Sequence, residues 1–240
     1  MVHSVKKIKN FFYIPFYYIR SIFTFGLFPS EFGEDKILKN LFKYKKGFYI
    51  DIGCHHPLKE SNTYYLFKKL NWRGINVDMS KKTINLFNKL RPNDLNINAA
   101  IGKNTKLTTG YFFDDLSCFN TLSLTKAKEI ERQLGYSYFK RSLSSISPKD
   151  LINKNNVKEV DFLNIDIEGL DQIILDLFPF DVVRPKVIAF ESHKRSIEKN
   201  INNMNLLNYF LVSKCGPTFI FIDKKKMGTK VWPHCLTKKL

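Results

Sequence analysis

Three patterns that mark common sites or membrane-spanning segments are missing from the sequence. No C-x-x-C pair occurs and the four cysteines are far apart, which argues against a structural zinc site and against a disulfide framework. No G-x-G-x-x-G stretch occurs, so the phosphate cradle that a dinucleotide cofactor needs is absent. The chain also lacks an uninterrupted apolar run of the about 20 residues that span a membrane. We therefore expect a protein with reduced thiols in the cytoplasm.

The most apolar stretch, residues 11–28, is interrupted by Pro15 and Arg20. No small-residue cleavage pattern follows it, so a secretory signal is not predicted. We predict that residues 1–30 form a basic, aromatic extension that either packs on the domain or lies on a membrane surface. The predicted location is therefore cytoplasmic, with peripheral contact at the membrane as an alternative.

The chain is strongly basic, with Lys+Arg 39 against Asp+Glu 22 and a net charge of +17. Such a charge suggests an anionic partner such as nucleic acid, a phosphorylated substrate or an acidic membrane surface. The lysines, however, are spread along the chain, often in helix-like segments where they form solvated faces. We therefore do not expect a nucleic acid partner.

Short apolar runs alternate with amphipathic segments from residue 47 onward, which predicts a parallel sheet with crossover helices. The predicted strands are 48–53, 74–79, 95–102, 107–113, 136–143, 160–166 and 186–192. The predicted helices are 61–71, 80–90, 123–134, 147–155, 168–178 and 196–207. The segments "YFLVS" and "TFIFID" are expected to close the sheet as an antiparallel pair. The fold prediction is one doubly wound α/β domain over 31–240.

Acidic or polar residues follow the predicted strands at the ends where ligands bind in open parallel sheets. The residues at these ends are Asp51 and Gly53, then Asp78 and Met79, Asn98 and Ala99, Asp166 and Glu168, and finally Glu191 and His193, so each end carries at least one acidic or polar side chain. The strand interiors are apolar, so this regular placement of polar groups predicts a binding site.

The first two strand ends indicate the kind of ligand. Gly53 allows the backbone to approach a bound molecule, and Asp78 is placed to bind the two hydroxyls of a ribose. Asp51 would repel a diphosphate but suits a cation, and S-adenosylmethionine carries both a sulfonium and an ammonium. In the loop that follows, we expect His55 to line the pocket. Asn62 either caps the first helix or contacts the cofactor.

Two longer segments carry a family resemblance: "FYIDIGCHHPLKESNTYYLFKKLNWRGINVD" (48–78) and "VDFLNIDIEGLDQIIL" (160–175). Together with the shorter segments 31–42, 91–102 and 119–123, they resemble the FkbM-type S-adenosylmethionine-dependent methyltransferases. The likeness covers about residues 31–222. It implies a class I methyltransferase fold, Rossmann-like, with a seven-stranded sheet whose last strand is antiparallel. It also implies O-methylation of a sugar, a glycan or a small metabolite.

The resemblance assigns roles to residues of this chain. Asp51 and Gly53 fall in the cofactor loop, Asp78 at the ribose contact, and Asp166 and Glu168 in an acidic motif beside the active site. The sequence departs from the family at Asp78-Met79, because many members have Asn or Pro after the acidic residue.

Methyl transfer needs a group that removes the proton of the acceptor. The candidate bases are Asp166, Glu168, Glu191 and His193, of which His193 has the most suitable unperturbed pKa. Because Asp166 and Glu168 are two positions apart, extended geometry would point both toward one face of the sheet. These residues could also bind a divalent cation, but we predict no metal site.

Two other functions fit parts of the sequence. One is a non-catalytic basic module on an α/β scaffold that binds RNA or an anionic membrane. The other is an enzyme with a nicotinamide cofactor, against which the missing glycines argue.

Overall fold

The computed structural model of the protein describes residues 30–43, 45–192 and 196–225. The predicted extension over residues 1–30 lies outside these ranges except for Ser30, so its packing or membrane contact stays a prediction. None of the helices in the described ranges is long and apolar enough to span a bilayer.

Seven strands form one large sheet. They are β1 (Phe48–Ile52), β2 (Arg73–Asp78), β3 (Leu95–Asn98), β7 (Phe162–Ile165), β8 (Val187–Glu191), β9 (Tyr209–Cys215) and β10 (Thr218–Asp223). The helices around it are α3 (Glu34–Phe42), α4 (Tyr64–Leu70), α5 (Lys81–Leu90), α7 (Pro148–Lys154), α8 (Asp171–Asp176) and α9 (Ile197–Leu206).

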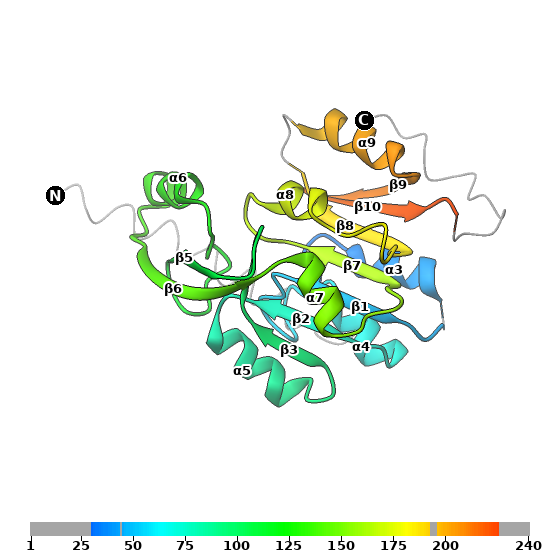
Figure 1. Cartoon of the computed structure of the whole chain (residues 1–240), viewed down its shortest axis with the longest axis horizontal. Helices are drawn as coiled ribbons and strands as arrows, with labels where there is room; N and C mark the ends of the chain where they lie inside the picture. The colour runs from blue at the N-terminus through cyan, green and yellow to red at the C-terminus, as the bar shows by residue number, and fades with distance from the viewer. Residues whose placement is uncertain (1–29, 44, 193–195, 226–240) are drawn as a thin grey trace.

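The strand order of the large sheet is β3-β2-β1-β7-β8-β10-β9 (Figure 1). The pairs from β3 to β8 are parallel, while β10 runs antiparallel to both β8 and β9. The chain builds outward from β1 to β3, returns to β7 beside β1, and then builds in the other direction. The predicted α/β class and the antiparallel closing pair are therefore confirmed, and the order reverses between β1 and β7.

The core lies on both faces of this sheet, and neighbouring residues of one strand face opposite sides. In β1, Ile50 and Ile52 join an apolar cluster with α7, α8 and α9, whereas Tyr49 joins a second cluster with α3 and α4. Burial on both faces explains why the strands read as continuous apolar runs.

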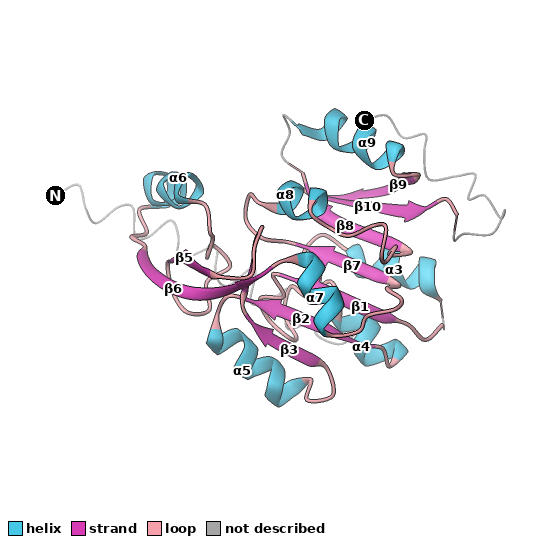
Figure 2. Cartoon of the chain, viewed as in Figure 1, coloured by secondary structure: helices cyan, strands magenta, loops and turns pink. Residues whose placement is uncertain are grey.

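A smaller sheet holds β4 (Ala100–Ile101), β6 (Phe139–Ile146) and β5 (Leu107–Phe112) in that order. It lies with α6 (Leu124–Leu134) to the left of the large sheet in Figure 2. The predicted strand 95–102 is therefore divided, because the chain leaves β2 after Asn98 and pairs its next residues with β6. The strand predicted over 136–143 instead begins at Phe139 and continues to Ile146.

Two helices begin three residues later than predicted. α4 begins at Tyr64 rather than at 61, because the preceding side chains serve buried polar contacts. α8 begins at Asp171 rather than at 168, because Glu168 (φ 34°) and Gly169 (φ 88°) have left-handed backbone conformations that end the run of β7 in a turn. Ser80 and Ser147 cap α5 and α7, because their side chains accept hydrogen bonds from Thr83 N and Asp150 N.

Candidate active site

A cavity of about 470 Å³ opens where the strand order reverses, at the carboxyl ends of β1, β2, β7 and β8. Its size suits a small-molecule ligand. The predicted site residues that line it are Asp51, Gly53, His55, Asn62, Asp78, Met79, Ala99, Asp166, Glu168 and Glu191. The structure thus brings together residues that are far apart in the sequence, as the strand-end pattern predicts.

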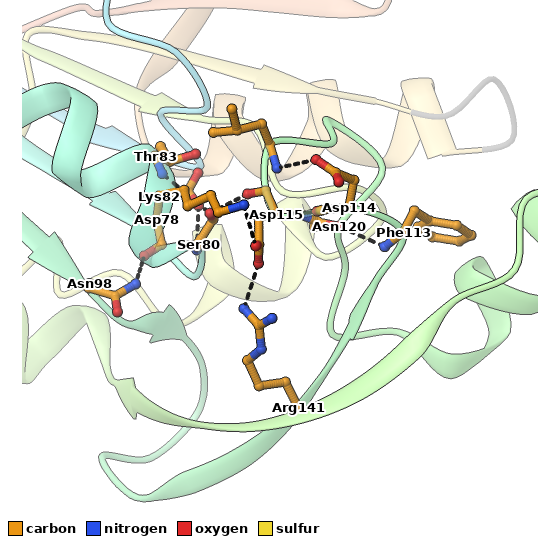
Figure 3. A network of polar contacts seen from close by, with 11 residues as sticks. Asp78, Ser80, Lys82, Thr83, Asn98, Phe113, Asp114, Asp115, Asn120 and Arg141 are labelled. Atoms are coloured by element: carbon orange, nitrogen blue, oxygen red, sulfur yellow. Dashed lines mark hydrogen bonds and ion pairs between the residues drawn. The ribbon is translucent and has the colours of Figure 1, made fainter.

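Two predicted site residues are not among them. Asn98 is exposed, and its side-chain amide donates a hydrogen bond to the backbone oxygen of Asp78 at 3.0 Å, so it lies outside the lining of the cavity. It supports the end of β2 from outside the cavity (Figure 3). His193 lies outside the described residues.

Gly53 lies where the backbone after β7 approaches the end of β1 most closely. Its φ is +79°, and a Cβ built on it would lie 1.8 Å from the backbone oxygen of Asp166. The backbone nitrogens of Gly53 and Asp166 in turn donate to Val77 and Ile52 at 2.9 Å. Glycine is therefore required here by a neighbouring strand and by the backbone conformation, in addition to the approach of a ligand that the sequence suggests.

Asp51 is buried on the floor of the cavity and is already hydrogen-bonded. Thr63 Oγ1 donates to it at 2.6 Å and Asn164 Nδ2 at 3.0 Å, while Asn62 Nδ2 donates to Asn164 Oδ1 at 3.1 Å. Burial raises the pKa of Asp51 despite these donors. Thr63 precedes α4 without capping it through its side chain. Asp51 therefore organises the first loop, and its charge favours a cation nearby.

Arg91, which the sequence gave no reason to select, holds the first loop in place. Its side chain is fully buried, and its guanidinium lies 5.0 Å from the centre of the Phe87 ring. It donates hydrogen bonds to Pro57 O at 3.1 Å, Ser61 Oγ at 2.9 Å, Thr63 Oγ1 at 2.9 Å and Tyr49 Oη at 3.2 Å. An arginine at the end of an amphipathic helix normally faces water, so no local pattern signals this role.

Asp78 is fixed at the end of β2 by two backbone donors. Its Oδ2 accepts from His55 N at 3.1 Å. Its Oδ1 accepts from Ser80 N at 2.7 Å, and Figure 3 shows these two residues. Burial raises the pKa of Asp78 to about 6. Each carboxylate oxygen keeps a lone pair for a further donor, so the group could accept hydrogen bonds from two ligand hydroxyls.

The neighbouring histidines have different roles. His56 Nδ1 accepts from Leu58 N and Lys59 N, both at 3.1 Å, and burial lowers the pKa of His56 to about 4. His56 is thus a neutral residue that shapes the loop. His55 lines the cavity, and burial lowers its pKa too. Burial raises the pKa of Cys54 well above its usual range, so this thiol is not an activated nucleophile.

An acidic group stands at the ends of β7 and β8. Burial and then the charge of Glu191 raise the pKa of Asp166 well above its usual range. Burial and then the charges of Asp171 and Glu168 raise the pKa of Glu191 to about 7. A carboxylate with a pKa near neutrality can accept a proton at physiological pH, as a general base must.

The sequence predicts that Asp166 and Glu168 lie in one extended segment, but in the structure they do not. Glu168 has a φ of 34° and lies in a turn, where its carboxylate is 3.5 Å from Lys126 Nζ of α6. Asp171, which sequence reasoning missed, closes this turn by accepting from Ile167 N at 3.3 Å. Among the described residues, no three His, Cys, Asp or Glu side chains are grouped to hold a metal ion.

The remaining wall of the cavity is the connection between β5 and α6. A run of residues from this connection, 117–122, lines the cavity. Asp115 fixes the connection, because its carboxylate lies 2.8 Å from Lys82 Nζ and 2.9 Å from Arg141 Nη1 (Figure 3). The hydroxyl of Ser80 donates to the backbone oxygen of Asp115. The wall is therefore joined to the residues beside Asp78.

Comparison with protein families gives an independent result. The family model described as "Methyltransferase FkbM domain" matches residues 51–217, more than half of the chain. This match confirms the resemblance found in the sequence. A comparison with curated proteins found no match. The matched segment starts at Asp51 and ends at Pro217, and both residues line the cavity.

Proposed function

The chain belongs to the FkbM methyltransferase family, and from this we propose that it transfers a methyl group from S-adenosylmethionine to a hydroxyl of a sugar, a glycan or a small metabolite. The observation that carries the proposal is the acidic cavity at the reversal of strand order, with Asp78 on one side and Asp166 and Glu191 on the other. The strand order and the antiparallel β10 support a Rossmann-like class I methyltransferase fold.

The charge of the cavity supports a cationic cofactor. The carboxylates that line it belong to Glu31, Asp51, Glu60, Asp78, Asp166, Glu168 and Glu191. No Lys or Arg lines it within the described ranges, although the whole chain carries +17. Such a lining disfavours polyphosphates and nucleic acid, and favours a ligand with positive charge.

The residues of the cofactor half fit S-adenosylmethionine. Asp78 would accept hydrogen bonds from the ribose hydroxyls, while Asp51 and Asn62 form the floor near the charged end of the ligand. Met79 and Ala99 would pack against the base. When bound, the cofactor supplies an electrophilic methyl group on a sulfonium.

The residues of the other half would remove the proton. As the methyl group is transferred to the acceptor oxygen, the hydroxyl proton would pass to a carboxylate of the cavity. Glu191, with its pKa raised to about 7, is the base that we propose, and the charges of Asp171 and Glu168 favour its protonated form. Glu168, held by Lys126, would orient the acceptor.

Titration calorimetry with S-adenosylhomocysteine, followed by a screen of sugars, glycans and small alcohols with radiolabelled S-adenosylmethionine, tests this function. We expect micromolar binding of S-adenosylhomocysteine and loss of label transfer in Glu191→Gln. Asp181→Asn, which changes an exposed carboxylate outside the cavity, is the matched control and should behave as wild type. If the folded protein binds neither S-adenosylmethionine nor S-adenosylhomocysteine, the proposal is overturned. Salt-dependent RNA binding by that protein would favour the basic binding module instead.

A further inference from the structure

The connection between β5 and α6 is an ordered wall. At its base, Tyr111 and Thr121 form an antiparallel pair with backbone hydrogen bonds of 2.8 and 3.0 Å. Across it, Asn120 accepts from Phe113 N at 3.0 Å and donates to Asp114 O at 2.8 Å. These contacts join the two sides of the loop, so the residues between them have a defined position.

The wall is fastened to both sides of the cavity. On the β2 side, Asp115 pairs with Lys82 and Arg141, as Figure 3 shows. On the β7 side, Thr121 Oγ1 donates to the backbone oxygen of Glu168 at 3.0 Å. The wall therefore spans from the proposed ribose contact to the acidic turn, and its position relative to both is set before any acceptor binds.

Phe119 is the aromatic residue that this wall contributes to the cavity lining. Its ring is 6.4 Å from that of Phe113 in an edge-to-face arrangement and 6.4 Å from that of Tyr136. Phe113 in turn lies 6.0 Å from Tyr138. Contacts of this geometry stabilise a ring in one orientation. The cavity thus combines an aromatic ring, supported by its neighbours, with several carboxylates.

We propose that Phe119 determines acceptor specificity by packing its ring against the apolar C–H face of a pyranose. This inference rests on the proposed methyl transfer and assigns the acceptor contact within it. A pyranose has apolar C–H groups on its faces and hydroxyls around its edge. An aromatic ring packs against the C–H groups. Carboxylates such as Asp166 and Glu191 accept hydrogen bonds from the hydroxyls. Phosphorylated or acidic sugars would be disfavoured by the same carboxylates.

Saturation-transfer difference NMR tests the inference without a known acceptor. The probe is a mixture of the methyl α- and β-pyranosides of glucose, galactose, mannose and fucose, added to protein saturated with S-adenosylhomocysteine. We expect transfer to ring C–H protons in the wild type and in Phe119→Tyr. We expect roughly tenfold weaker binding in Phe119→Leu and Phe119→Ala. Phe210→Leu changes a half-buried aromatic residue of β9 outside the cavity lining and serves as the matched control.

Calorimetry and thermal melting of each variant separate the possible results. Failure of the wild type to bind S-adenosylhomocysteine would overturn the proposed function itself. If the cofactor product binds, equal transfer in wild type and Phe119→Leu would overturn the role of Phe119 and leave the methyltransferase function in place. Absence of saturation transfer to every pyranoside in the mixture would also overturn the role of Phe119.

Discussion

A side chain at position 53 would place its Cβ 1.8 Å from the backbone oxygen of Asp166. These two residues directly follow β1 and β7, which lie more than a hundred positions apart in the sequence, yet they line one cavity. The cofactor loop and the acidic turn are therefore a single packed unit, and a change on one side should affect the other.

Gly53→Ala tests this unit. We expect a loss of more than about 3 kcal/mol in the free energy of unfolding, because the new Cβ meets a backbone atom and φ is +79°. Urea denaturation measures it. Gly135→Ala is the matched control, since φ is +73° there but nothing lies within 4 Å of the added Cβ. Its free energy of unfolding should fall by only about 1 kcal/mol. Equal losses in the two variants would contradict the predicted clash between the Cβ at position 53 and the backbone oxygen of Asp166.

Asp78→Asn should weaken binding of S-adenosylhomocysteine by about 10- to 100-fold, that is by about 1.5–3 kcal/mol. The amide removes the charge that a ribose would use and leaves one of two backbone donors, His55 N or Ser80 N, without an acceptor. Calorimetry gives the affinity. Asn98→Ala, outside the cavity beside Asp78, should change it by less than about threefold. An unchanged affinity in Asp78→Asn would remove this residue from the cofactor site.

Arg91→Lys should destabilise the fold by about 3 kcal/mol, because lysine cannot satisfy the several acceptors that the guanidinium reaches. It should also weaken binding of S-adenosylhomocysteine, since the first loop loses its support. Chemical denaturation and calorimetry measure the two effects. Arg73→Lys is the control: Arg73 is half-buried and donates to the backbone of Trp72, so we expect a change within about 0.5 kcal/mol.

The rate of methyl transfer should rise with pH through about 7. Glu191 accepts a proton only when ionised, and its pKa is raised to about 7 by burial and then by Asp171 and Glu168. Asp171→Asn removes the neighbouring charge that raises the pKa of Glu191 most. It should therefore move the midpoint of the kcat/KM profile to lower pH. Glu191→Gln should abolish the transition. A midpoint that Asp171→Asn leaves in place would assign the transition to another group.

The same raised pKa has a consequence for stability. Folded protein keeps the proton of Glu191 up to about pH 7, whereas the unfolded chain releases it near pH 4.5. The proton on Glu191 therefore stabilises the folded state. Its contribution to the free energy of unfolding is fully present below pH 4.5 and is lost as the pH rises to about 7. Urea denaturation from pH 4.5 to 7.5 should show a smaller decline in Glu191→Gln than in wild type. Identical pH dependence in both proteins would contradict a raised pKa.

Asp115→Asn should loosen the wall between β5 and α6. Its ion pairs with Lys82 and Arg141 are lost, so amide hydrogen exchange over residues 113–122 should speed up by roughly threefold. Asp114→Asn changes the adjacent carboxylate, which accepts a hydrogen bond from Leu116 N and forms no ion pair with the residues that the structure describes. It should leave the exchange nearly unchanged. High salt should bring wild type toward Asp115→Asn, because it screens the ion pairs.

Local sequence patterns determined much of the fold. Apolar runs, amphipathic segments and the caps Ser80 and Ser147 set the order of strands and helices. Because parallel strands place their carboxyl ends at one edge, the polar residues after each strand were sufficient to predict where the cavity lies. Asp78, Asp166 and Glu191 were found in this way.

Tertiary structure alone decided which of those residues share one site and what holds them there. The hydrogen bond from Asn164 to Asp51 joins positions 113 residues apart, and the contacts of Arg91 reach 28 to 42 positions back along the chain. The divided strand at Asn98 and the left-handed turn at Glu168 likewise depend on partners elsewhere. Hydrophobic periodicity records which face of an element is buried, but it does not record the partner of a buried polar group, because that partner is brought near only when the sheet assembles.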